Sequence, residues 1–197
     1  MSEDADRDET TRAIMEGTYR ALCEHGYPET TISKIADEFG RSRSLLYYHY
    51  EDKDELLTDF LRFLIDRVES DLDTEALDDP AEELTQSIDR FVPEPMDDDQ
   101  LNFRQAYFEI RSQAPHKPTY RALIGETDAL IIDHLADTIE RGIEDGTFRA
   151  VDAEATASFL YSSMYGTMVR GVTLEEQSLI RRNRETLFDY VDRHLRS

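Results

Sequence analysis

The chain has 197 residues and a formal net charge of -22, because 44 aspartates and glutamates stand against 22 lysines and arginines. A hydrophobic fraction of 39% is enough to bury a core, which excludes a disordered acidic tail. An acidic surface also argues against general affinity for nucleic acid, so any DNA site has to be local.

Only three of the basic residues are lysines, namely Lys34, Lys53 and Lys117. High acidity with few lysines favours a salt-adapted (halophilic) host, since concentrated salt screens the self-repulsion of such a surface. Cys23 is the single cysteine, which excludes an internal disulfide and fits a reducing compartment. No signal peptide and no membrane-spanning run is recognisable. We therefore expect a cytoplasmic protein that does not enter a membrane.

Helical periodicity dominates, and strand-like alternation is almost absent. The first predicted helix ends at His25 and Gly26, where glycine supplies a C-terminal cap. Thr31 is predicted to cap a second helix that ends at Gly40. The buried face of the first helix is predicted to consist of Ile14, Gly17, Ala21 and Leu22.

Ser42 is predicted to cap a short third helix that ends near Tyr50. Asp52, with Glu55 three residues later, forms a capping-box pattern that opens a fourth helix. This fourth helix is expected to join a small N-terminal head to a larger helical body.

The body begins with Asp79, Pro80 and Glu82, which are typical of an N-cap, a first-turn proline and a capping-box acid. Residues 97–99 are expected to cap the next helix and not to bind calcium, because a calcium-loop glycine is missing. Further helices are expected at residues 101–113, 118–145, 153–172 and 175–195. The predicted fold class is all-α, with about nine helices, a three-helix head and a helical body.

A helix, a glycine turn and a short second helix form a helix-turn-helix when the second helix exposes side chains to a DNA groove. Residues 30–57 read TTISKIADEFGRSRSLLYYHYEDKDELL, and this run resembles the N-terminal domain of the tetracycline-repressor (TetR) family of transcription regulators. The matching positions are Thr31, Ile35, Ala36, Gly40, Ser42, Leu46, Tyr47, His49, Tyr50, Lys53, Leu56 and Leu57. Arg41 departs from the family, which usually has an apolar valine there.

The resemblance implies a DNA-binding domain over residues 1–54 and an effector-binding and dimerisation domain over residues 55–197. It also implies a dimeric, sequence-specific regulator, most simply a repressor, on a palindromic operator in double-stranded DNA. Leu46 and Tyr50 are expected to face the interior of the head. The residues expected to contact DNA are Thr31, Arg41, Ser42, Arg43, Ser44, Tyr47, Tyr48, His49 and Lys53.

The last two predicted helices combine small residues with an apolar seam, which favours close helix packing. We expect them to form the homodimer interface, as the resemblance also implies, and completion of a monomeric core is the alternative. The small residues are Ala155, Ala157, Ser158, Ser162, Ser163, Gly166, Thr167 and Gly171. The seam is Ile180, Leu187, Val191 and Leu195.

In the family, a body pocket binds a small-molecule effector that shifts the spacing of the heads and weakens DNA binding. The candidate pocket residues are Phe103, Tyr107, Phe108, Leu130, Ile131, His134, Met164 and Tyr165. Their apolar character favours a hydrophobic or aromatic effector. An ordinary core is the alternative, and for His134 the alternative is a hydrogen-bonded core histidine.

Two other classes of function remain open: a helical interaction module without DNA binding, and an enzyme. The sequence contains no glycine-rich phosphate loop, nucleophile elbow, metal-spaced histidine pair or paired-cysteine motif. We therefore expect no enzymatic activity, catalytic residue, cofactor or metal.

Overall fold

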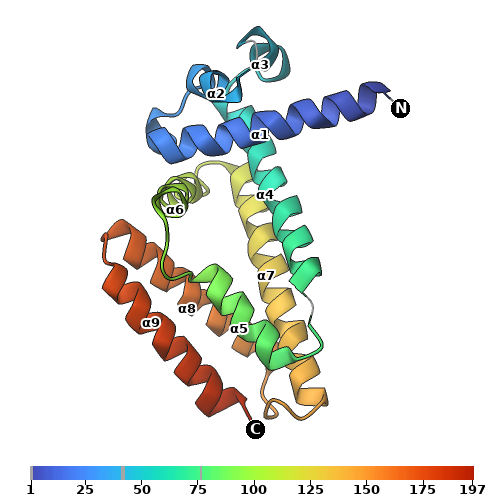
Figure 1. The fold of residues 1–197 in the computed structure, drawn as a ribbon, viewed down its shortest axis with the longest axis vertical. Helices are drawn as coiled ribbons and strands as arrows, with labels where there is room; N and C mark the ends of the chain where they lie inside the picture. Colours follow the sequence, from blue (N-terminus) through green and yellow to red (C-terminus); the bar gives the residue numbers. More distant parts are fainter. Residues whose placement is uncertain (1, 41–42, 76) are drawn as a thin grey trace. The chain divides into compact units, whose positions relative to one another are not determined.

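The computed structural model describes residues 2–40, 43–75 and 77–197 (Figure 1). Within these ranges the chain forms nine α-helices and a final π-helical turn, and its only β-type pairing is an isolated bridge between Phe148 and Arg196. The predicted all-α fold is therefore confirmed. The α-helices are α1 (Ser2–Glu29), α2 (Ile32–Phe39), α3 (Arg43–His49), α4 (Lys53–Glu75), α5 (Pro80–Phe91), α6 (Asp98–Arg111), α7 (Pro118–Glu144), α8 (Ala153–Thr173) and α9 (Gln177–Tyr190).

The chain divides into two compact units, and α4 and α7 contribute residues to both. Unit 1 comprises Met1–Asp66 and Asp97–Ile124, and unit 2 comprises Arg67–Met96 and Gly125–Ser197. Unit 1 thus includes the predicted head together with the start of α4, α6 and the start of α7. The functional boundary at residue 54 stays a prediction. None of the helices in the described ranges is long and apolar enough to cross a membrane.

In unit 1, α1 packs against α2 and α6. The predicted end of the first helix appears as a break inside α1, where Gly26 has a φ of 68°. A Cβ atom at Gly17 would lie 3.0 Å from the Cα of Phe39, so glycine lets α2 approach α1 closely. Ile14, Ala21 and Leu22 are buried, as the periodicity predicted.

Local caps set the helix starts in unit 1. The hydroxyl of Thr31 accepts the Lys34 N–H at 3.3 Å and caps α2. Asp52 accepts the Glu55 N–H at 2.9 Å, but the Glu55 carboxylate returns to the Glu51 N–H, not to that of Asp52. Asp97 and Gln100 form the complete, reciprocal capping box that opens α6.

In unit 2, α8 and α9 lie side by side (Figure 1). The helix predicted at 175–195 is shorter in the structure, because α9 ends at Tyr190 and a π-helical turn, Val191–Leu195, follows. This end is tied to a neighbouring loop, where Arg149 N–H donates to the Leu195 carbonyl at 2.7 Å. The predicted apolar seam is buried within the chain at Ile180, Leu187, Val191 and Leu195.

Candidate nucleic-acid interface

Helix α3 is seven residues long and buries only Leu46, while Tyr50 is buried directly after it. The predicted inward orientation of these two residues is therefore confirmed. On the other side, Tyr47 and Tyr48 are 55% and 84% exposed. The transfer of a large aromatic side chain out of water lowers the free energy. Two exposed tyrosines on one short helix therefore indicate a surface that binds a partner.

Arg43 opens α3 and is held by two residues of α2. Its Nε donates to Asp37 Oδ1 at 3.1 Å, and its Nη2 donates to the same oxygen. Its Nη1 donates to the Ser33 hydroxyl at 3.4 Å. The sequence singled out Arg43 but did not pair it with Asp37 or Ser33, because an acid six residues before an arginine follows no helical spacing.

The other described residues of the predicted DNA-contacting surface differ in their exposure and in the contacts they already make. Ser44 is exposed, and Thr31 is exposed although its hydroxyl already serves as the cap of α2. His49 is half-buried, and its ring meets the Tyr48 ring edge-on with centroids 5.5 Å apart. Two further predicted contacts, Arg41 and Ser42, lie outside the described residues.

Lys53 is engaged with α1 more closely than the sequence suggests. Its ammonium donates to the Tyr27 carbonyl and lies 4.0 Å from the centroid of the Tyr27 ring. Burial lowers the pKa of Lys53, Asp54 opposes this shift, and Lys117 adds to it. An ammonium held in this way is less available to a DNA phosphate than a solvated one.

The predicted effector residues separate into two groups, one in each unit. In unit 1 the rings of Phe103, Tyr107 and Phe108 follow one another along α6, with centroid distances of 6.4 Å and 6.2 Å. Phe103 also lies 4.6 Å from the Tyr19 ring and 6.3 Å from the Phe60 ring. These residues form an aromatic cluster inside unit 1.

The second group lies in unit 2 and comprises Leu130, Ile131, His134, Met164 and Tyr165. Met164 is buried, and the other four are half-buried. Tyr165 stacks on Tyr161 with ring centroids 6.2 Å apart, and the Tyr161 hydroxyl donates to Asp128. A single pocket that contains both groups stays a prediction.

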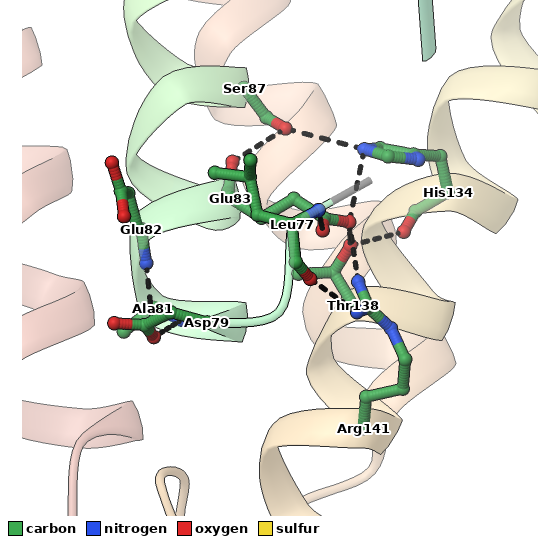
Figure 2. Close-up of polar contacts among 9 residues, drawn as sticks. All are labelled: Leu77, Asp79, Ala81, Glu82, Glu83, Ser87, His134, Thr138 and Arg141. Atoms are coloured by element: carbon green, nitrogen blue, oxygen red, sulfur yellow. Dashed lines mark hydrogen bonds and ion pairs between the residues drawn. The ribbon is translucent and has the colours of Figure 1, made fainter. Parts of the chain in front are cut away.

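Beside His134 lies a buried carboxylate that the sequence did not single out (Figure 2). Glu83 is only 1% exposed. It accepts hydrogen bonds from the Thr138 hydroxyl at 2.6 Å, from Arg141 Nη2 at 2.5 Å and from the Leu77 N–H at 2.6 Å. His134 Nε2 lies 3.7 Å from the same carboxylate.

These hydrogen bonds decide the charge state of Glu83. Burial alone raises the pKa of Glu83, but Thr138, Arg141 and Leu77 together lower it below its ordinary value. The carboxylate is therefore ionised at neutral pH. Asp79 caps α5 as predicted, because it accepts the Ala81 and Glu82 N–H groups, but the carboxylate that reaches back to the chain before the helix is that of Glu83 and not that of Glu82.

The outward side of α8 carries an uncharged stripe of four exposed residues. They recur at i, i+3, i+4 and i+7, so they share one face of the helix. Phe159 is 49% exposed, and its ring lies 5.1 Å from that of Tyr190 on α9. The stripe consists of Ala155, Ser158, Phe159 and Ser162.

No group of three histidines, cysteines, aspartates or glutamates in the part of the chain that the structure describes is arranged to hold a metal ion.

Two family models match the chain. Residues 14–59 match the model described as bacterial regulatory proteins, tetR family, and residues 80–196 match the model of the BetI-type transcriptional repressor, C-terminal. The first match covers the glycine turn and α3. The second covers more than half of the chain.

Among solved structures, a TetR transcription regulator from Haloarcula marismortui is 34% identical, with a TM-score of 0.87 over 96% of this chain and 100% of that chain. A transcriptional regulator from Saccharomonospora viridis in complex with choline is 23% identical, with a TM-score of 0.84 over 96% and 99% of the two chains. The transcriptional repressor AcnR of Corynebacterium glutamicum is 24% identical over 81% of this chain and 80% of its own length.

Proposed function

This chain belongs to the tetR family of bacterial regulatory proteins and is a DNA-binding transcriptional regulator, and we propose that it acts as a cytoplasmic, dimeric repressor on a palindromic operator. The observation that carries the proposal is the outward face of α3. This helix has no acidic residue in a chain of net charge -22, and it exposes an arginine, a serine and two tyrosines.

These four side chains suit a DNA groove. Arginine can donate two hydrogen bonds to the edge of a guanine, and serine or tyrosine can reach bases or phosphates. The lack of acids in this helix also favours the contact, because the net charge of the chain opposes the approach of DNA phosphate. Repression, as opposed to activation, is supported by relatives that are named repressors.

Dimerisation through the last two helices is the second part of the proposal. The seam of α9 and of the π-helical turn after it is already buried within one chain, so we assign the contact to the outward stripe of Ala155, Ser158, Phe159 and Ser162. Small residues allow a second helix to approach, and Phe159 provides apolar area. A twofold dimer would read two half-sites about 34–36 Å apart, or a multiple of this spacing.

Release by a small molecule is the third part. The candidate residues named above are apolar or aromatic and suit a hydrophobic or aromatic effector. A quaternary ammonium is the second candidate, because unit 2 places the Phe91, Tyr161 and Tyr165 rings in succession beside Asp128. The choline-bound relative supports only the choice of this compound as a probe.

The first prediction tests the DNA surface. In concentrated potassium salt, the protein should protect a symmetric, two-part site in the DNA flanking its own gene. Arg43→Ala should weaken binding to that site by about 10- to 100-fold, because a bidentate arginine contact to a base is lost. Tyr48→Ala should also weaken it. Footprinting and fluorescence anisotropy give the site and the affinities.

Arg62→Ala is the matched control, because Arg62 is also an exposed arginine of unit 1 that is paired with an acid, Asp59. It should bind the site as the wild type does. A wild-type protein with no preference over random DNA would refute the proposal. Addition of choline or of aromatic compounds to the complex tests the effector class, and the effective compound should dissociate it.

A further inference from the structure

Asp37 and Arg43 form an ion pair across the turn of the helix-turn-helix. Their side chains are 54% and 58% exposed. Exposed ion pairs add little to the stability of a fold, because water and salt screen them and two flexible side chains lose entropy. The pair therefore contributes little to holding the fold together.

The hydrogen bonds of Arg43 divide its guanidinium into two parts. A guanidinium has five N–H groups in a rigid plane. Asp37 takes one N–H from Nε and one from Nη2, and Ser33 takes one from Nη1. Among the described residues, these contacts leave one N–H on each of Nη1 and Nη2, and two such donors are what a bidentate contact to guanine O6 and N7 requires.

From this geometry we propose that Asp37 is a positioning residue that presents Arg43 to a guanine in the major groove. The inference rests on the proposed function and deepens it. A guanidinium that is already oriented loses less rotamer freedom when it meets the base. The carboxylate also offsets the charge of Arg43, which weakens its attraction to phosphates of any sequence. Both effects favour the operator over other DNA.

The test measures the contribution of single guanines to binding. The probe is a duplex that the wild-type protein selects from a random-sequence library, with each guanine replaced in turn by 7-deazaguanine, which lacks the N7 acceptor. In the wild type, one guanine in each half-site should show a penalty of about 10-fold or more. Arg43→Ala should abolish that penalty and so identify the guanine that Arg43 contacts.

Asp37→Ala should reduce the penalty at the same guanine to below about 3-fold, because the arginine is no longer oriented toward N7. Its affinity for a random duplex should stay equal or rise. The double variant Asp37→Ala with Arg43→Ala should show no penalty beyond that of Arg43→Ala alone. Glu38→Ala is the matched control, since it removes the same charge from the next residue, whose carboxylate lies 3.7 Å from Arg20. It should keep the full penalty.

If a folded Asp37→Ala protein showed the same 7-deazaguanine penalty as the wild type, the inference would be overturned. This holds also if the variant bound every duplex more tightly by the same factor. Circular dichroism verifies folding, and if the alanine variant is unfolded, Asp37→Asn is judged by the same criterion. If the wild type selects no sequence at all, the proposed function itself fails. Selection by the wild type with an unchanged penalty in Asp37→Ala refutes only the role of Asp37.

Discussion

At the scale of single residues, the carboxylates of this chain are of two kinds: some are solvated by water, and others are buried and accept hydrogen bonds from the protein. Glu83 belongs to the second class, because three hydrogen-bond donors replace the water that it loses on burial. Two of the donors, the Thr138 hydroxyl and the Arg141 guanidinium, lie one turn apart on α7, and the third is the Leu77 N–H, which precedes α5. Glu83 thus fixes the start of α5 against α7.

Glu83→Gln should destabilise the protein by about 1.5–3 kcal/mol at pH 7, since an amide NH₂ would replace an acceptor that faces donors. The folded-state pKa of Glu83 is lowered from its ordinary value of 4.5. Its stabilisation is therefore complete above that value and is lost as the pH falls through the lower folded-state pKa. The difference in unfolding free energy between wild type and variant should be constant from pH 7 to about 5 and shrink below.

Urea unfolding at several pH values measures this difference. Glu82→Gln is the control, because it removes the same charge from the preceding residue, which is exposed. It should change the unfolding free energy by less than about 0.5 kcal/mol. Equal effects of the two substitutions would mean that the hydrogen bonds of Glu83 contribute nothing specific.

The residues that the sequence predicted correctly are those whose structural role depends on near neighbours. Thr31 and Asp97 each cap a helix by accepting an N–H three residues further along the chain, and Leu46 and Tyr50 share a face by spacing alone. Residues whose partners lie far along the chain were missed. Arg141 reaches Glu83 across 58 positions, and no local pattern indicates such a pair.

At the scale of helices, the contact between α8 and α9 depends on a glycine. A Cβ atom at Gly171 would lie 2.2 Å from Cγ1 of Ile180, which is buried. The side chain of Ile180 therefore occupies the space that any other residue would need. The close approach of the two helices follows from this position.

Gly171→Ala should destabilise the protein by about 1–3 kcal/mol, because the added methyl group must displace a packed side chain. Gly166→Ala on the same helix is the control, since a Cβ atom there meets nothing within 4 Å. It should stabilise the protein by about 0.5–1 kcal/mol, because alanine favours the helix. Urea unfolding distinguishes the two signs, and a loss of the same size in both variants would contradict the packing argument.

Helices could be predicted from the sequence better than their partners could. Caps and glycines gave the ends of α2, α6 and α7 to within a few residues, because these signals are local. Periodicity also identified the apolar seam of α9, but it does not say what covers a face. The structure buries the seam against the same chain, so the proposed dimer contact moves to the exposed stripe of α8.

At the scale of the whole molecule, the net charge of -22 opposes the approach of DNA. Four acids, Asp37, Glu38, Glu51 and Asp52, flank the segment 39–50 that is predicted to contact DNA. Two of them lie beside arginines: Asp37 pairs with Arg43, and Glu38 lies 3.7 Å from Arg20. Asp52 caps α4 and stays exposed, as does Glu51. The repulsion is therefore moderated near the contact helix. A salt-adapted host stays a prediction.

The logarithm of the affinity for the operator should fall with the logarithm of the salt concentration less steeply than the slope of about -0.9 per phosphate contact. The reason is that acids beside the DNA hold cations in place, whereas a basic protein would displace them from the DNA. Anisotropy titrations across a series of KCl concentrations give the slope. The double variant Glu38→Gln with Glu51→Gln should steepen it. The same change in net charge at two exposed acids of α7 in unit 2, Glu140→Gln with Glu144→Gln, should leave it unchanged. If both double variants steepened the slope equally, the effect would come from total charge and not from the acids beside the DNA.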